Sequence, residues 1–178
     1  MFWRSIGLAI VMALSLPLMQ GEVMGAEGDL LPRFVSLGAK RIYLRVGPSK
    51  TFPVAWELRQ EGAPVEVILE YDSWRKVRDV EGTEGWAHKS MLTGKRAVVV
   101  LQGTHALYKR ANDQSSVVAH VEQGVVGQLL QFTEEWCEIK LGGHPGGHKG
   151  WMRRESVWGI YPQERKSSRK CWLPFFCR

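Results

Sequence analysis

The feature that most constrains the fold is an internal repeat. Segments 61–78 (EGAPVEVILEYDSWRKVR) and 123–140 (QGVVGQLLQFTEEWCEIK) carry glycine, apolar residues and tryptophan at matching positions, with a constant offset of 62 residues. The pairs Gly85-Trp86 and Gly150-Trp151 continue the match at an offset of 65, so the second copy holds three extra residues. Two copies of a small unit account for the chain length of 178 residues better than one large domain does.

Each copy is dominated by the signals of short β-strands. In the first copy, the runs 65–71 (VEVILEY) and 74–78 (WRKVR) are rich in β-branched and aromatic residues, and the polar pair 72–73 separates them. Glu81-Gly82 marks a hairpin turn. After the N-terminal stretch, no segment of ten or more residues has a clean helical period. We therefore expect an all-β protein with two packed units, joined by a short link around Lys95 to Val99.

The N-terminus has the organisation of a secretory signal peptide, which we place at residues 1–26. Arg4 precedes the apolar run Ile6 to Met19, and the small residues Gly25 and Ala26 follow, so cleavage after either one fits the pattern. The run is shorter than the roughly 20 apolar residues of a membrane span. The sequence predicts an exported protein, located in the periplasm or secreted.

The C-terminal tail, residues 163–178, combines positive charge with aromatic residues. From Glu164 to Arg178 it holds five cations and one anion, whereas the whole chain has a formal charge of +6. A nucleic-acid binder would spread its cations over a folded face, so we expect no nucleic-acid partner. The tail composition fits docking on an anionic membrane surface, a cover over an open strand edge, or a tail without a role.

No catalytic, metal or cofactor site emerges from the residues. Cys171 and Cys177 are candidates for a disulfide in an oxidising compartment, which would leave Cys137 as a buried lone thiol. His144 and His148 fall short of the three or four ligands of a zinc site. The stretch 45–51 (RVGPSKT) lacks the glycine that a phosphate-binding loop has before its lysine. We expect a protein that is not an enzyme.

Residues 43–92 resemble the bacterial SH3-like (SH3b) domain. The resemblance rests on the stretch LRVGPS (44–49), on a glycine turn before an apolar strand, on Trp74 three residues before Val77, and on Gly85-Trp86. The second copy keeps the tryptophans but has KRAND (109–113) in place of the glycine-proline turn. The resemblance implies two tandem SH3-like half-open barrels of five to six strands, at residues 36–95 and 98–162, the second one divergent. The resemblance also implies that the protein is exported and functions at the cell envelope.

Small barrels of this kind bind extended ligands in grooves lined by aromatic side chains. In the first copy we select six ligand-binding candidates, although the tryptophans also fit a role in the core: Tyr43, Trp56, Asp72, Trp74, Arg78 and Trp86. We expect a non-enzymatic binding module for the stem peptide of peptidoglycan or for an extended segment of an envelope protein. The alternative is a structural adaptor that the tail docks on the membrane surface.

Overall fold

The structure is a computed structural model, and it describes residues 30–142 and 147–164. The predicted signal peptide, the candidate disulfide between Cys171 and Cys177, and the tail beyond Glu164 lie outside these residues. Among the described residues, no helix has the length and apolar character to cross a membrane.

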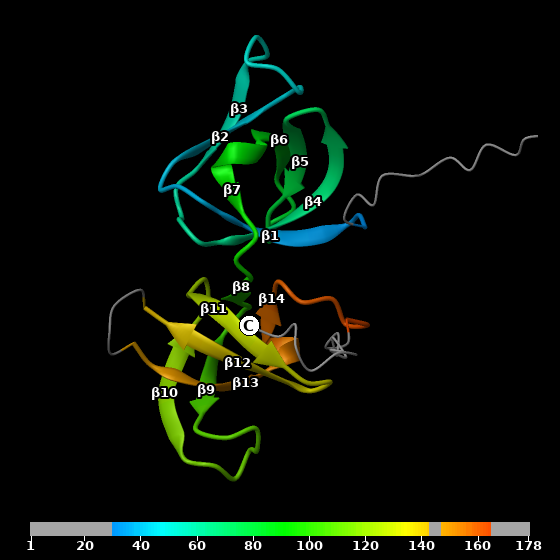
Figure 1. Ribbon diagram of the computed structural model, residues 1–178. Coiled ribbons are helices and arrows are strands. Elements are labelled where there is room, and N and C mark those ends of the chain that lie inside the picture. The colour runs from blue at the N-terminus through cyan, green and yellow to red at the C-terminus, as the bar shows by residue number, and fades with distance from the viewer. Residues whose placement is uncertain (1–29, 143–146, 165–178) are drawn as a thin grey trace, which may run out of the picture.

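The described chain forms two antiparallel sheets, one after the other along the sequence (Figure 1). The first contains β1 (Arg33–Leu37), β2 (Ile42–Arg45), β3 (Val54–Leu58), β4 (Pro64–Tyr71), β5 (Trp74–Arg78), β6 (Glu84–His88) and β7 (Leu92–Thr93). The second contains β8 (Ala97–Val100), β9 (Thr104–Tyr108), β10 (Val117–Glu122), β11 (Val126–Phe132), β12 (Trp136–Leu141), β13 (Lys149–Arg153) and β14 (Val157–Trp158). A 3₁₀ turn precedes the last strand of each sheet, η1 (Lys89–Met91) and η2 (Arg154–Ser156).

The repeat seen in the sequence is a repeat of topology. The strand order is β3-β2-β6-β5-β4-β1-β7 in the first sheet and β10-β9-β13-β12-β11-β8-β14 in the second, so each strand has its counterpart in the same place. The prediction of an all-β fold with two tandem units is confirmed. The expected count of five to six strands per unit was too low, because the short last strand of each unit pairs with its first strand.

The two copies agree even in their irregularities. A bulge interrupts the β4–β5 ladder between Val67 and Leu69, and the β11–β12 ladder between Leu129 and Gln131. Gly62 and Gly124 both have φ +80°, a conformation that favours glycine in the turn before the long strand. The predicted turns at Asp72-Ser73 and Glu81-Gly82 also lie between strands.

Each sheet curls around its own apolar core. In the first barrel the core consists of Leu37, Ile42, Leu44, Val65, Val67, Val77 and Ala87. The second is built from Val98, Val100, Leu107, Val121, Leu129, Cys137, Ile139, Met152, Val157 and Ile160. These residues alternate with outward-facing ones along the strands, which is the period-2 pattern that one buried face requires.

The predicted link around Lys95 to Val99 was wrong in its extent. Ala97–Val100 is strand β8, with all four residues buried, and only residues 94–96 connect the two sheets. The run of β-branched residues is a strand because it pairs with both β11 and β14. The connection between the barrels is therefore very short.

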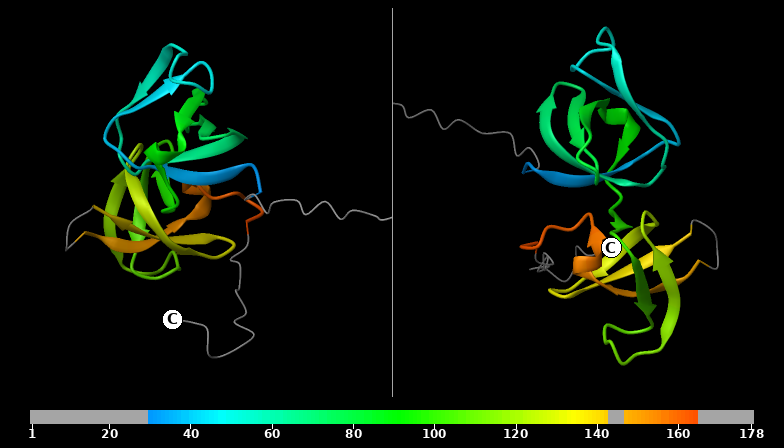
Figure 2. Two further views of the ribbon diagram at one scale, coloured as in Figure 1. Left: turned by 45° about the horizontal axis from the view of Figure 1, so that its top comes forward. Right: turned by 180° about the vertical axis from the view of Figure 1, so that it is seen from behind.

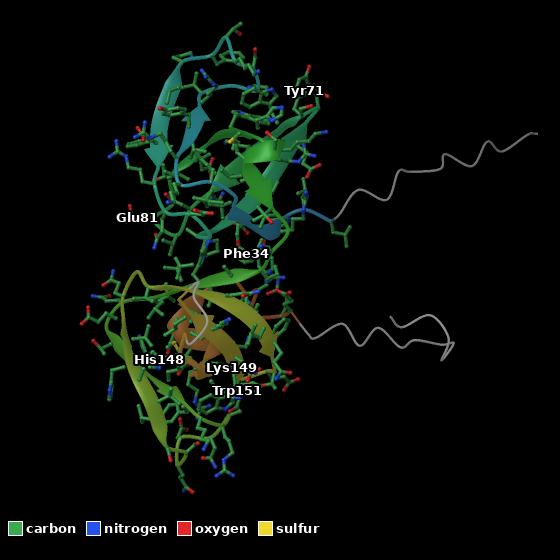
Figure 3. All side chains as sticks on the ribbon, turned by 60° about the vertical axis from the view of Figure 1, so that its left-hand side comes forward. Phe34, Tyr71, Glu81, His148, Lys149 and Trp151 are labelled. Atoms are coloured by element: carbon green, nitrogen blue, oxygen red, sulfur yellow. The ribbon has the colours of Figure 1, made fainter. Side chains whose placement is uncertain are left out.

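The barrels meet where β1 of the first lies near β14 of the second (Figures 1 and 2). The ring of Phe34 packs edge-on against Trp158 at 4.8 Å and lies 4.6 Å from the ring of Tyr161. Phe34 lies at the junction and Tyr71 lies at the far end of the first barrel (Figure 3). The β2–β3 hairpin also points away from the second barrel (Figure 1).

Candidate functional site

Strands β5 and β6 carry the candidate site on the outside of the first barrel. Val77 and Ala87 point inward and are buried, so their neighbours Lys76 and Trp86 point outward. Lys76 and Trp86 lie opposite each other in the ladder. Alternation along paired strands therefore builds one continuous outer face.

Strand register arranges this outer face in three rows. The first row runs Tyr71–Trp74–His88, the second Leu69–Lys76–Trp86–Arg45, and the third Glu66–Arg78–Glu84. Aromatic and apolar side chains dominate the first two rows, and ion pairs dominate the third. We call these rows together the outer face.

Five of the six predicted residues lie on or beside the outer face. Trp74, Trp86 and Arg78 belong to its rows, and Asp72 stands in the turn between β4 and β5. Tyr43 is 46% exposed and lies two residues before Arg45 on β2, so the two share a side of the strand.

Trp56 does not join the other five residues. It pairs with Leu44, a core residue, and therefore points to the opposite side of the β2–β3 hairpin from Tyr43. Its side chain is 56% exposed because the hairpin reaches beyond the packed part of the barrel. Trp56 is thus outside the outer face.

Trp74 forms the floor of the face. It is 9% exposed, and the ring of His88 stands edge-on to it at 5.5 Å. The residues that offer exposed surface beside it are Tyr71, at 63%, and Leu69, at 52%. Sequence analysis did not select Tyr71, Leu69, Lys76, Arg45 or His88, although alternation on β4, β5 and β6 is a signal that points to them.

Arg78 is held in a network of ion pairs. Its Nε donates to Glu84 Oε1 at 2.9 Å, and its Nη1 lies 3.4 Å from Glu66 Oε2. Hydrogen bonds from Lys76 and from Arg78 lower the pKa of Glu84, so this carboxyl remains ionised between the two cations. Arg78 is therefore held within the third row. The second row has two cations: Lys76, which pairs with Glu84 at 2.6 Å, and Arg45, which donates to the carbonyl of Phe52 at 2.5 Å.

In the second barrel, a side chain of the barrel itself covers the tryptophan that corresponds to Trp74. Arg153 occupies the place that His88 has in the first barrel, and its guanidinium lies 4.3 Å from the ring centre of Trp136. Arg153 pairs with Glu135 at 2.7 Å and also with Asp113. The loop of the first barrel that corresponds to the loop of Asp113 is residues 46–53, between β2 and β3. This loop contains no carboxylate, so no group in it holds a cation over Trp74.

The second row also differs between the barrels. Glu138 stands opposite Trp151, where the first barrel has Lys76 opposite Trp86. Glu138 is 9% exposed and is bound by Gln131 at 2.8 Å and Lys149 at 3.1 Å. The first barrel thus leaves Tyr71 and Leu69 exposed beside its floor tryptophan, whereas the second covers its tryptophan with Arg153.

Cys137 is buried, as expected for a structural thiol. Its Sγ donates to the carbonyl of Met152 at 3.5 Å, and burial raises the pKa of the thiol to about 12. A group so rarely ionised near neutral pH is a poor nucleophile. Within 30–142 and 147–164, no group of three or more His, Cys, Asp or Glu side chains is placed to hold a metal.

Comparison with solved structures finds proteins of the NlpC/P60 type. NlpC2 from Trichomonas vaginalis is 12% identical, over 76% of this chain and 51% of that one, with a TM-score of 0.34. An NlpC/P60 family protein from Bacillus cereus is 17% identical, over 70% of this chain and 55% of that one, with a TM-score of 0.32. The chain spans about half the length of these structures, and TM-scores this low carry no conclusion about function. No curated protein matches the chain.

Family comparison gives a direct match to the description "Bacterial SH3 domain". The matches cover residues 38–94 and 102–159, one in each barrel, and together they make up more than half of the chain. They coincide with the two sheets of identical strand order. The chain therefore belongs to the bacterial SH3 domain family and carries two tandem copies of the domain.

Proposed function

We propose that the protein is an exported, non-enzymatic binding module that holds an extended peptide on the outer face of its first barrel. The peptide is either the stem peptide of peptidoglycan or an extended segment of an envelope protein. Bacterial SH3 domains are often cell-wall binding modules, which supports the first ligand class.

The observation that carries the proposal is the contrast between the two barrels. Equivalent aromatic positions exist in both, but only the second has an arginine fixed over its floor tryptophan by two carboxylates. In the first barrel, the exposed Tyr71 and Leu69 and the half-buried Trp86 lie around the floor tryptophan Trp74. Aromatic side chains beside a few polar groups are the usual composition of peptide-binding grooves.

Binding by the full secreted chain to purified peptidoglycan, measured by co-sedimentation, tests the proposal. We expect Tyr71→Ala and Trp86→Ala each to weaken binding by about tenfold, the loss typical of a central aromatic contact. Trp56→Ala is the matched control, because Trp56 is exposed but lies on the other side of the hairpin. Thermal unfolding of each variant verifies that its fold is intact.

The result also separates the two ligand classes. Binding to peptidoglycan that depends on Tyr71 and Trp86 supports the stem peptide. If the intact chain does not bind peptidoglycan, cross-linking of the exported protein in cells, with and without Trp86→Ala, tests the envelope-protein alternative. Equal binding by Trp86→Ala and Trp56→Ala in both assays would reject the outer face as the site. Cell fractionation tests the proposed export.

A further inference from the structure

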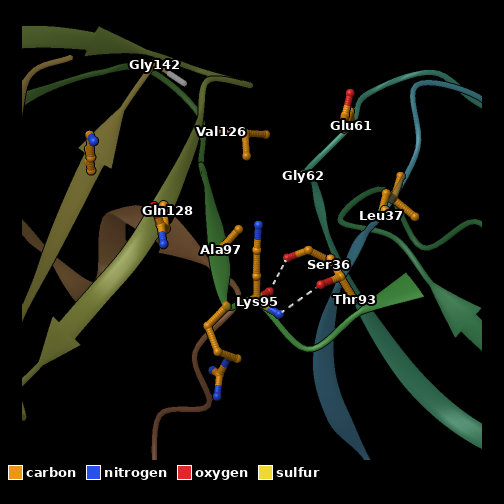
Figure 4. Close-up of a pocket in the computed structure, with 13 residues that line it drawn as sticks. Ser36, Leu37, Glu61, Gly62, Thr93, Lys95, Ala97, Val126, Gln128 and Gly142 are labelled. Atoms are coloured by element: carbon orange, nitrogen blue, oxygen red, sulfur yellow. Dashed lines mark hydrogen bonds between the residues drawn. The ribbon is translucent and has the colours of Figure 1, made fainter. Parts of the chain in front are cut away.

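A second candidate site lies between the barrels and shares no residue with the outer face. A cavity of about 400 Å³ is bounded by both barrels and by the link (Figure 4). Its volume falls within the roughly 300–1,000 Å³ of small-ligand sites, which often form at domain interfaces. Glu61 and Leu37 come from the first barrel, Lys95 from the link, and Val126, Gln128 and Lys140 from the second barrel.

The walls of the cavity are held in place by contacts that cross the junction. The hydroxyl of Ser36 donates to the carbonyl of Lys95 at 2.7 Å, which fixes the backbone of the link. The side chain of Gln60 donates to the carbonyl of Gly124 at 3.1 Å, next to the turns that carry Glu61 and Val126. Because these contacts exist without a ligand, a ligand would not have to order the walls on binding.

Three of the four charged side chains around the cavity have no ion-pair partner in the part of the chain that the structure describes. Neither Lys95 nor Lys140 has an ion-pair partner among the described residues, and the same is true of Glu61. The remaining charged residue of the wall, Arg96, is already paired with Glu164 at 2.8 Å. Counting only partners within 30–142 and 147–164, the wall therefore holds two ammonium groups and one carboxylate outside any ion pair.

Apolar and neutral polar groups complete the wall. Figure 4 shows the side chain of Lys95 extending between Val126 and Gln128 on one side and Leu37 and Glu61 on the other. The amide of Gln128 makes no hydrogen bond to another described residue, so its donors and acceptor are available.

We propose that this interdomain cavity binds a small ligand with two carboxylates and one ammonium group, as found in an acidic amino acid. Lys95 and Lys140 receive the carboxylates, and Glu61 receives the ammonium group. Charge-assisted hydrogen bonds of this kind are stronger than neutral ones and fix the ligand's orientation. The carbon chain of the ligand lies against Leu37 and Val126.

Glutamate is the simplest probe with this charge pattern, and titration of the full secreted chain followed by ¹H–¹⁵N NMR tests its binding. We expect saturable shifts at the backbone amides of Gly62, Val126 and Gln128 with the L- or the D-enantiomer. Glutamine, which lacks the second carboxylate, should bind at least about tenfold more weakly, because one charge-assisted contact is lost. Higher salt should weaken the binding of glutamate.

The double variant Lys95→Gln, Lys140→Gln should abolish the saturable shifts and leave the spectrum of the folded protein otherwise intact. The double variant Lys109→Gln, Arg110→Gln removes an equal charge from exposed positions in the loop after β9, and should bind glutamate like the natural chain. Absence of saturable shifts with both enantiomers would overturn the proposal, as would unchanged binding in the Lys95→Gln, Lys140→Gln variant. Neither result bears on the outer face, which is tested with peptidoglycan.

Discussion

The hydroxyl of Tyr161 donates a 2.8 Å hydrogen bond to Glu66 Oε1, across 95 positions of the sequence. Tyr161 follows the last strand of the second barrel and Glu66 lies on β4 of the first. The same carboxylate faces Arg78 through its other oxygen, so the junction and the outer face share one residue. Burial, and then the hydrogen bond to Glu66, raise the pKa of the phenol, which therefore stays a donor at neutral pH.

Loss of this single hydroxyl should weaken the junction. We expect Tyr161→Phe to lower the free energy of unfolding by about 0.5 to 1.5 kcal/mol, the net contribution of a hydrogen bond, while the ring still packs on Phe34. Urea unfolding measures the change. Tyr71→Phe is the matched control, since the Tyr71 side chain is 63% exposed. Equal stability of Tyr161→Phe and Tyr71→Phe would show that the hydrogen bond contributes nothing.

The glycine before Trp86 should be essential for closing the first barrel. A Cβ at Gly85 would lie 2.7 Å from Leu44 Cβ, closer than carbon atoms approach each other, so β2 and β6 would have to separate. We expect Gly85→Ala to cost about 1 to 3 kcal/mol of stability, as overpacking of a core usually does. Gly94→Ala is the control, because a Cβ there meets nothing within 4 Å. Thermal unfolding compares the two, and a Tm for Gly85→Ala as high as that for Gly94→Ala would contradict the packing argument.

The sequence predicted the architecture because the repeat and the turns are local signals. Glycine at 62 and 124, and the polar pair at 72–73, mark turns through their own backbone preferences, which the rest of the fold does not override. The constant offset of 62 residues between segments 61–78 and 123–140 then allowed the strands predicted for the first copy to be predicted for the second copy as well. The six selected residues included Trp86 and Arg78, which the β5–β6 ladder places on one side of the sheet.

Two interpretations differ from the structure where strand pairing decides the outcome. Trp56 was grouped with Tyr43, but the register of the β2–β3 hairpin sets it opposite Leu44 and on the other side, and register cannot be deduced from composition. The link was placed around Lys95 to Val99, although residues 97–99 are buried in β8 by pairing with β11 and β14. The interdomain cavity depends on how the two barrels pack together, for which the sequence contains no local signal.

Arg153 should stabilise the second barrel through both its ring contact and its ion pairs. We expect Arg153→Ala to lower the Tm, because it uncovers the ring of Trp136 and leaves Asp113 and Glu135 close together. Arg153→Lys should recover only part of the loss, since an ammonium group cannot pair with two carboxylates in the planar geometry of a guanidinium. Arg110→Ala, in the same loop as Asp113 and exposed, is the control.

Salt distinguishes the two contributions of Arg153. The difference in Tm between the natural chain and Arg153→Ala should shrink at high ionic strength, because the ion pairs are partly exposed and screened, but should not vanish, because the ring contact persists. A Tm for Arg153→Ala equal to that for Arg110→Ala at low salt would mean that Arg153 does not hold the face of the second barrel closed.

The buried thiol of Cys137 should make stability depend on pH on the alkaline side. Its pKa is about 12 in the folded chain and about 8.5 in an unfolded one, so the unfolded chain loses this proton first as the pH rises. The contribution to stability is complete below pH ~8.5 and is lost as the pH rises through the window from there towards 12, with a slope of at most ~1.4 kcal/mol per pH unit. Urea unfolding under reducing conditions, from about pH 7 to about pH 10, covers the onset of this loss and measures the slope. Cys137→Ala removes the ionisable group and should be less stable at neutral pH but should have a flatter pH profile. Parallel profiles for the two chains would show that Cys137 does not titrate on unfolding in this range and that its burial has no part in the alkaline loss of stability.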